Sequence, residues 1–285
     1  MMRTLKTGLL LTAMTLLLVF GGEALAGRQG MTFGLIIAVF MNGIAYFFSD
    51  KIALASSGAH PVSREQAPRL YAVMERLAAK GNLPMPKLYI IPQAAPNAFA
   101  TGRNPSHASV AATEGLLELM NDDELEGVIA HELSHVRNYD ILTTSIAATL
   151  AGVIGWIGYA ARWGMIFGGI GGDRERRGSG LEVLLMAIVA PIAAMLLQLG
   201  ISRQREYAAD AAGARLVGHP YGLISALEKL GAYNNRIPMT NVTPATSSLY
   251  IVTPLSPGQV FKGLFSTHPP LPERIEALRR MTITR

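Results

Sequence analysis

Two histidines stand four residues apart in the stretch 131–135, and a glutamate follows the first of them. If this stretch is helical, His131 and His135 lie one turn above each other and direct two imidazoles toward one point. Imidazole nitrogen is a preferred ligand of zinc, and Glu132, rotated away from that direction, suits a general base that takes a proton from water. A helix with two histidines that bind nothing is the alternative. The spacing therefore predicts a hydrolytic zinc centre.

A catalytic zinc ion usually takes three protein ligands, so a third residue is needed. The chain has no cysteine, which leaves imidazole or carboxylate. The metzincin pattern is excluded, because Asn138 and Ile141 occupy the positions where it requires glycine and histidine. Glu206 is a carboxylate candidate, and Asp210, one turn later, would accept the distal N–H of a ligating histidine. Acidic pairs at this spacing are also common on solvated helix faces, so spacing alone leaves both explanations open.

The composition places part of the chain in lipid. Of the 285 residues, 50% are hydrophobic and only 16% are charged, and the mean hydropathy is +0.29, outside the usual range of soluble domains. The net charge of +5 comes from scattered basic residues without a stripe that would fit nucleic acid. We expect a lipid bilayer, and no nucleic acid, as a partner.

Four apolar segments have the length of spanning helices: Thr7 to Gly22, Met31 to Ser49, Ile141 to Ala160 and Leu181 to Ile201. The first also fits a cleavable signal peptide, because basic residues precede it and small residues follow. A basic N-terminus kept in the cytoplasm would place the region after residue 50 there as well.

The last two apolar segments flank a charged, glycine-rich loop at 168–180. Metal ligands that precede and follow these two segments must lie on the same side of the membrane. The two segments therefore either each cross the bilayer once or pack as a hairpin that does not cross it. Arginines in their connection oppose full crossing. We predict four parts: 1–49 with two transmembrane helices, 50–140 with the first half of a cytoplasmic catalytic domain, 141–201 with two membrane-associated or transmembrane helices, and 202–285 with the second half of the catalytic domain.

The catalytic parts predict a small sheet among helices. Helical periodicity marks 66–80, 202–217 and 273–280, a further helical stretch covers 114–120, and short extended runs mark 88–91, 97–101 and 109–112. Asn121 and Glu124 form a capping-box pattern at which the histidine helix should begin. The predicted fold class is α+β and mostly helical, with a small β-sheet and fused transmembrane helices.

Longer motifs surround these residues. They are PNAFATG at 96–102, TEGLL at 113–117, ELEGVIA at 124–130, SRQREYAAD at 202–210 and THPP at 267–270. Over nearly its whole length the chain resembles the membrane zinc metalloproteases that include the heat-shock protease HtpX and the CAAX prenyl endopeptidases. The arrangement of its apolar segments fits the HtpX-like layout better than the seven-span prenyl proteases.

The resemblance implies a gluzincin-type metalloprotease domain that binds one Zn²⁺ ion per subunit. It implies His131, His135 and Glu206 as the ligands and Glu132 as the catalytic residue. It further implies an endopeptidase of the bacterial inner membrane that degrades misfolded or damaged membrane proteins from the cytoplasmic side, in a stress response, with contacts to other membrane proteases as an open expectation.

Three further expectations are weaker. The run Asn97, Ala98, Phe99, Ala100 and Thr101 is a candidate edge strand that would pair with a substrate backbone, or an ordinary strand and turn. His268 is a candidate hydrogen-bond donor to the oxyanion, or a loop histidine before two prolines. For Arg274 we expect an acidic partner, Asp210 or Asp140. A non-enzymatic scaffold whose metal joins two helices and a transporter are the rival functions.

Overall fold

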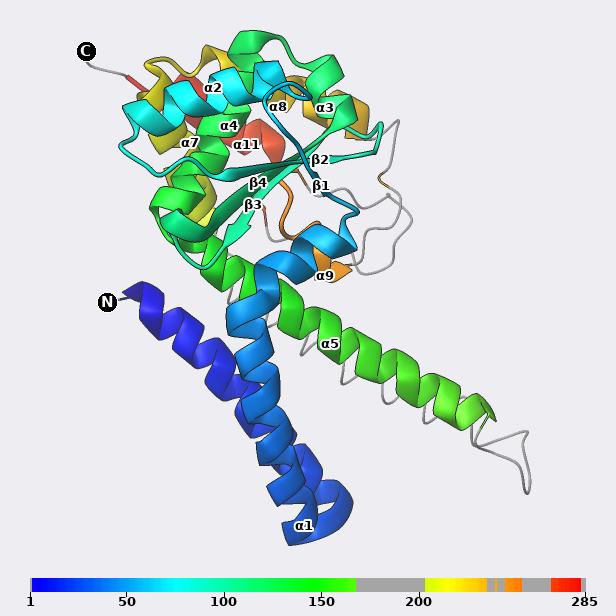
Figure 1. The fold of residues 1–285 in the computed structure, drawn as a ribbon. Helices are drawn as coiled ribbons and strands as arrows, with labels where there is room; N and C mark the ends of the chain where they lie inside the picture. The colour runs from blue at the N-terminus through cyan, green and yellow to red at the C-terminus, as the bar shows by residue number, and fades with distance from the viewer. Residues whose placement is uncertain (1, 168–202, 235–238, 240–243, 253–267, 283–285) are drawn as a thin grey trace.

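Two long apolar helices at the N-terminus form a hairpin below the rest of the molecule (Figure 1). The computed structural model describes residues 2–167, 203–234, 239, 244–252 and 268–282. Helix α1 (Met2–Ser56) is broken at Ala26 and Gly27, where Gly27 has a φ of 59° that side chains disfavour. Its arms, Leu5–Glu23 and Ala26–Ser56, are each long and apolar enough to cross a bilayer. These arms agree with the first two predicted spans.

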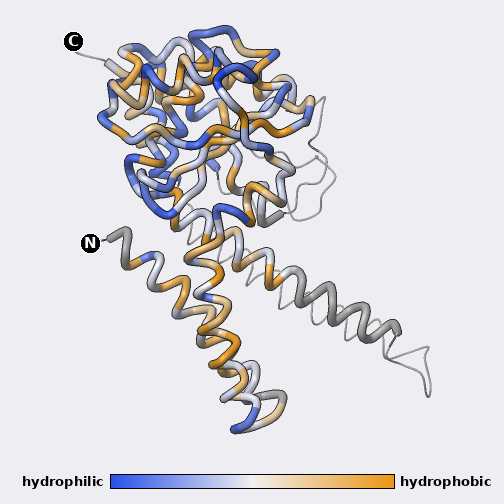
Figure 2. Tube along the Cα trace, in the orientation of Figure 1, coloured by the Kyte–Doolittle hydropathy of each residue, from blue (hydrophilic) through white to orange (hydrophobic). Residues whose placement is uncertain are grey.

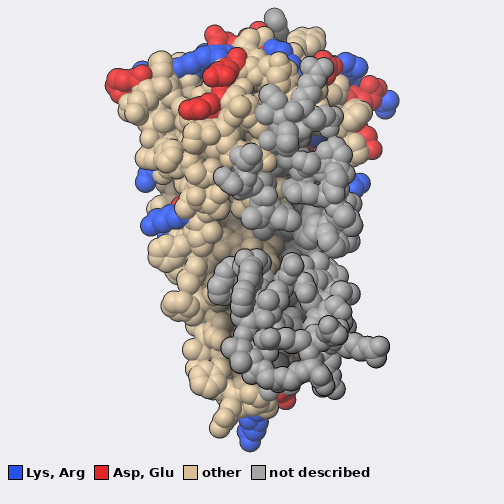
Figure 3. Space-filling view, turned by 90° about the vertical axis from the view of Figure 1, so that its right-hand side faces the viewer, with Lys and Arg blue, Asp and Glu red and all other residues tan. Residues whose placement is uncertain are grey.

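The hairpin presents apolar side chains outward. Phe33 is 66% exposed and Phe40 is 69% exposed, and the hairpin is coloured as hydrophobic along most of its length (Figure 2). On the described surface in Figure 3, charged residues lie on the upper domain and at the far tip, with an uncharged column between them. Helix α5 (Asp140–Phe167) packs beside the hairpin, and the hydroxyls of Thr7 and Thr143 are hydrogen-bonded at 3.0 Å. An exposed apolar surface of this kind is typical of helices that contact lipid.

A four-stranded mixed sheet lies in the domain above the hairpin, in the order β1-β2-β4-β3. Its strands are β1 (His60–Pro61), β2 (Lys87–Ile91), β3 (Ala98–Gly102) and β4 (Ala108–Thr113). Strand β4 pairs parallel with β2 and antiparallel with β3, and β1 pairs antiparallel with β2. Strand β3 is therefore an edge. The three predicted strands are confirmed, and β1 was not predicted.

The two faces of the sheet have different neighbours. On β3, Ala98 and Ala100 pack into the main core with helix α2 (Pro68–Lys80) and helix α4 (Asp122–Arg137). Phe99, which points to the opposite face, packs in a second cluster with the end of α1 and with Ala148 of α5. One strand thus contacts both the domain interior and the base of the apolar helices.

Helix α4 runs through the centre of the domain. The other described helices are the 3₁₀ turn η1 (Pro105–His107), α3 (Glu114–Leu119), α7 (Arg203–Val217), α8 (Tyr221–Asn234), α9 (Pro244–Ser247) and α11 (Leu271–Arg279). Helices α7 and α8 both pack on α4. A Cβ on Gly127 of α4 would lie 2.5 Å from the backbone nitrogen of Leu223, so the glycine permits α8 to approach. The mostly helical α+β class is confirmed.

The start of α4 agrees with its sequence signal. The Asn121 side chain accepts from the Glu124 N–H at 2.9 Å, and the Glu124 carboxylate accepts from the Asn121 N–H at 2.9 Å. Helix α8 was not predicted. The predicted loop at 168–180 and the predicted span at 181–201 lie outside the described residues, so complete crossing by the third and fourth apolar segments stays a prediction.

Candidate active site

Helix α4 brings the two motif histidines together in the buried centre of the domain. The Nε2 atoms of His131 and His135 are 3.2 Å apart, and the His131 side chain is 1% exposed. The helix can place them there because its remaining faces carry apolar residues for the core, among them Leu125, Val128 and Leu133. The convergence predicted from the four-residue spacing is present.

Glu206 reaches the same point from the first turn of α7. Its carboxylate oxygens lie 3.7 Å from Nε2 of His131 and 3.5 Å from Nε2 of His135. Helix α7 approaches α4 closely because Gly213 lies against it: a Cβ there would be 2.9 Å from the backbone nitrogen of His131. Glu206, which follows the third and fourth apolar segments in the chain, thus contacts both histidines.

The three side chains fit a zinc ion. Ligands that bind zinc tetrahedrally at about 2.0–2.1 Å stand about 3.3 Å from one another. One ligand atom from each of His131, His135 and Glu206 lies within 4.8 Å of the others. The two imidazole nitrogens are 3.2 Å apart, and the Glu206 carboxylate approaches His135 through Oε1 at 3.5 Å and His131 through Oε2 at 3.7 Å, which is near the tetrahedral value. Two nitrogens and one carboxylate oxygen are also a common donor set of catalytic zinc.

Asp210 and Arg274 form a buried pair behind His131. Nδ1 of His131 lies 2.8 Å from Oδ1 of Asp210, and Arg274 donates to both oxygens of that carboxylate at 2.8 and 2.7 Å. Arg274 also donates to the carbonyl of Ile251 at 2.9 Å. Of the two acidic partners expected for Arg274, the structure places Asp210 there. The predicted contact of Asp210 with a histidine is also present.

The electrostatics favour the metal-binding form of His131 and Glu206 and the ionised form of Asp210. Burial lowers the pKa of His131 and so keeps it neutral. Burial alone would raise the pKa of Asp210, but Arg274 overrides it and lowers that pKa to about 2. Burial also opposes the charge of Glu206, yet His268 and His135 hold its pKa well below the ordinary range. The carboxylates are therefore ionised at neutral pH.

Glu132 lies beside this cluster without joining it. It is 2% exposed, and burial, aided by the negative charge of Glu206, raises its pKa to about 7. A backbone hydrogen bond from Ala100 of β3 opposes that rise. A carboxyl group with a pKa near neutrality can both accept and return a proton at physiological pH.

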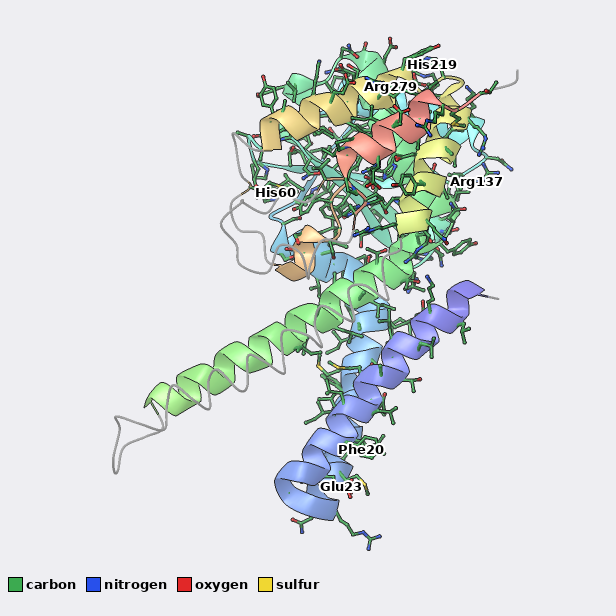
Figure 4. All side chains as sticks on the ribbon, turned by 180° about the vertical axis from the view of Figure 1, so that it is seen from behind. Phe20, Glu23, His60, Arg137, His219 and Arg279 are labelled. Atoms are coloured by element: carbon green, nitrogen blue, oxygen red, sulfur yellow. The ribbon has the colours of Figure 1, made fainter. Side chains whose placement is uncertain are left out.

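His268 joins the site from the start of the C-terminal segment. Its Nδ1 lies 2.9 Å from a carboxylate oxygen of Glu206, and its Nε2 lies 3.4 Å from the carbonyl of Ser248. It lines the same cavity as the three candidate ligands and Glu132. The structure thus brings His268 into the site, and its role as an oxyanion donor stays a prediction. His60 and His219 lie at the outside of the domain, away from the site (Figure 4).

The predicted substrate strand borders the cavity. Ala100 lines it, and Ala98 and Ala100 share the backbone orientation that faces away from β4. Part of this edge is already occupied, because the Ile251 N–H donates to the carbonyl of Ala98 at 3.0 Å. The Asn97 side chain is also engaged and donates to the carbonyl of Val252 at 2.8 Å. The backbone of Ala100, the next outward-facing residue of this edge, is hydrogen-bonded to Glu132. The Thr101 hydroxyl is hydrogen-bonded to the hydroxyl of Ser145 in helix α5 at 2.7 Å.

Asp140 is a second carboxylate close to the candidate ligands, and the sequence did not predict its contact with a histidine. Asp140 lies 3.4 Å from Nδ1 of His135 and accepts from Arg205 at 3.1 Å. Burial lowers the pKa of His135, but the negative charges of Glu206 and Asp140 outweigh it and raise that pKa to about 9. The sequence signal for this contact is an aspartate five residues after the second histidine, at a helix start.

The geometry agrees with a comparison to known families. The model of peptidase family M48 matches residues 63–282, which include every candidate ligand. The chain belongs to peptidase family M48. Members of this family are zinc metalloproteases, and the chain is a protease.

Similar proteins extend the match to the apolar helices. A protease HtpX homolog of Desulfatibacillum aliphaticivorans is 56% identical over 96% of this chain and 88% of its own. One from Syntrophotalea carbinolica is 52% identical over 99% and 100%, and one from Pyrococcus furiosus is 49% identical over 98% and 96%. The expected HtpX-type resemblance is confirmed. With the two apolar helices, it indicates a membrane metalloprotease.

A solved structure shares the fold. The crystal structure of S. mikatae Ste24p superposes with a TM-score of 0.52 at 18% identity, covering 97% of this chain and 65% of that one. The chain thus spans about two thirds of the length of Ste24p. At this identity the likeness concerns the fold alone.

Proposed function

We propose that the chain is a zinc-dependent endopeptidase that hydrolyses peptide bonds of misfolded or damaged membrane proteins. One observation carries the proposal: His131, His135 and Glu206 converge within zinc-binding distances beside Glu132. The convergence joins helices α4 and α7, which are separated in the chain by two apolar segments. It supports a catalytic rather than a scaffolding metal, because structural zinc normally has four protein ligands and this cluster has three among the residues that the structure describes.

The side chains around the cluster have different roles in the proposed hydrolysis. When bound, zinc supplies Lewis-acid chemistry that acidifies a water molecule and polarises the carbonyl of the scissile bond. Glu132, with its pKa near 7, removes a proton from the attacking water and delivers it to the leaving amine. The edge of β3 that borders the cavity at Ala100 pairs with the substrate backbone, and His268 donates to the developing oxyanion.

The surroundings of the site support a membrane substrate. The cavity is lined by Ile141 and Thr144 from the first turns of α5, and α5 packs directly on the apolar hairpin. A chain segment that emerges from the bilayer beside α5 would therefore lie near the active site. We place the domain on the cytoplasmic side of a bacterial inner membrane, since Arg3 and Lys6 precede the first apolar arm and Lys51 follows the second. A role in stress response and contacts with other membrane proteases belong to the same proposal.

Changing Glu132 to Gln tests the mechanism. We expect the full-length variant in detergent to retain one zinc per chain, while hydrolysis of casein falls by several orders of magnitude, because the proton acceptor is lost and the ligands are not. The matched control is Glu118→Gln, an exposed glutamate of α3, which should hydrolyse casein at the wild-type rate. Full activity of Glu132→Gln would refute the mechanism. Wild-type protein without stoichiometric zinc would refute the metal site.

Cleavage of a membrane substrate needs its own assay. Wild-type protein in liposomes should cut a destabilised helical membrane protein at sites near the bilayer surface, faster than the same protein in its folded form. Equal rates for the two forms would contradict the proposed substrate class while leaving the protease itself unaffected.

A further inference from the structure

The two histidine ligands are held differently. A metal-binding histidine usually donates its other ring N–H to an acceptor, which fixes the tautomer and the ring orientation. His131 has such a partner in Asp210, at 2.8 Å. For His135 the corresponding nitrogen, Nδ1, faces Oδ2 of Asp140 at 3.4 Å.

The turn after α4 places Asp140 under the second histidine. Asn138 closes α4 in a helical conformation, and Tyr139 then takes a φ of 59°. Helix α5 then begins at Asp140, whose side chain is 6% exposed and faces His135 in the last turn of α4. A non-glycine residue at positive φ is uncommon and is maintained only when its surroundings require it.

The second oxygen of Asp140 is also engaged. Nη1 of Arg205 donates to Oδ1 at 3.1 Å, so that the carboxylate is held between a cation and the imidazole. Arg205 directly precedes Glu206 in α7. The same aspartate therefore contacts one candidate ligand and the residue next to another.

Two simpler roles for Asp140 are insufficient. An acidic residue in the first turn of a helix stabilises the helix dipole, but that effect needs no buried position and no histidine. An ion pair with Arg205 alone would leave Oδ2 free of a specific neighbour, whereas Oδ2 is the oxygen that faces Nδ1. The contact with His135 is the feature that neither role explains.

We propose that Asp140 is the positioning residue of His135: it accepts the Nδ1–H and so directs Nε2 toward the metal, while Arg205 fixes the carboxylate. The inference rests on the proposed zinc site and adds a residue to it. The first turn of the apolar helix α5 thereby becomes part of the metal site.

Metal affinity, measured without any substrate, tests the inference. Full-length protein in detergent is titrated against a chelator to obtain the zinc dissociation constant, and Co²⁺ is substituted to record its visible spectrum. Asp140→Asn should weaken zinc binding about 10–100-fold, the usual effect of losing such a partner, and should alter the Co²⁺ bands. The matched control is Asp123→Asn, an exposed acid in the first turn of α4, which should leave both readouts unchanged.

Each outcome has one meaning. A zinc affinity of Asp140→Asn within about threefold of wild type, with an unchanged Co²⁺ spectrum, would overturn the inference. If that variant does not fold, Arg205→Gln decides instead: it leaves Asp140 in place but loosens it, so unchanged affinity and spectrum would overturn the inference and a weaker zinc affinity would support it. Wild-type protein that binds no zinc would defeat the proposed site itself, which separates the two failures.

Discussion

Replacing Arg274 by Met should destabilise the domain more than almost any other single change. The Arg274 side chain is 0% exposed, and its guanidinium supplies two hydrogen bonds to Asp210 and one to Ile251. Without it, Asp210 remains as a buried carboxylate whose pKa is no longer held near 2. Removing one partner of a buried ion pair costs about 3–5 kcal/mol. At about 2–4 °C per kcal/mol for a domain of this size, the thermal midpoint should fall by roughly 10 °C.

Thermal unfolding of the full-length, chelator-treated protein in detergent measures this effect without a contribution from metal. The matched control is Arg279→Met on the same helix, because Arg279 is 57% exposed and pairs with Glu228 at the surface. Such a pair contributes about 0–1 kcal/mol, so the control midpoint should change by no more than about 3 °C. The double change Arg274→Met with Asp210→Asn should recover part of the loss, because the uncompensated charge is gone. Equal midpoints for the Arg274 and Arg279 variants would refute the reasoning.

Three further predictions concern metal binding and packing. Zinc must displace the proton held by His135, because the pKa of this side chain is raised to about 9. The zinc affinity, corrected for protonation of the chelator, should therefore rise about tenfold per pH unit from pH 7 toward pH 9. A zinc affinity that does not change with pH would contradict this. Gly127→Ala should lower the thermal midpoint by an amount equivalent to about 1–3 kcal/mol, because its Cβ would collide with the backbone of α8, whereas Gly155→Ala, which meets nothing, should not. Lys229→Met should also lower the midpoint, because the buried carboxylate of Glu124 loses its cation at 2.7 Å; an unchanged midpoint would show that this carboxylate needs no partner.

Local signals in the sequence predicted the elements that carry the ligands. Helix α4 has both a capping box and a histidine pair at helical spacing, and each signal needs only a few neighbouring residues. The apolar positions of α2, such as Leu70 and Leu77, repeat at the helical period and are buried as expected. Glu206 was less certain from spacing alone, because a carboxylate pair on a helix has several explanations. The resemblance to a known family was needed to identify Glu206 as the third ligand.

Features that depend on tertiary contacts could not be predicted in this way. Helix α8 contains Gly222 and Gly231, which weaken its helical signal; Gly222 is explained by the backbone of α4, which a Cβ at that position would meet at 2.1 Å. The contact of Asp140 with His135 depends on the positive φ of Tyr139, which nothing in the local sequence demands. Asp140 had been considered only as a partner for Arg274.

In the proposed membrane topology, the break at Ala26 and Gly27 limits where a substrate can be cut. Because the chain reverses there and the second arm returns, the N-terminus ends beside the domain (Figure 1). A hairpin of this form leaves only a short turn at the opposite end, which carries Glu23 (Figure 4). If the two arms cross the bilayer as proposed, all the groups suited to hydrolysis in the described part of the chain lie in one compartment. A peptide bond exposed in the other compartment is out of reach unless its segment is first drawn across the lipid.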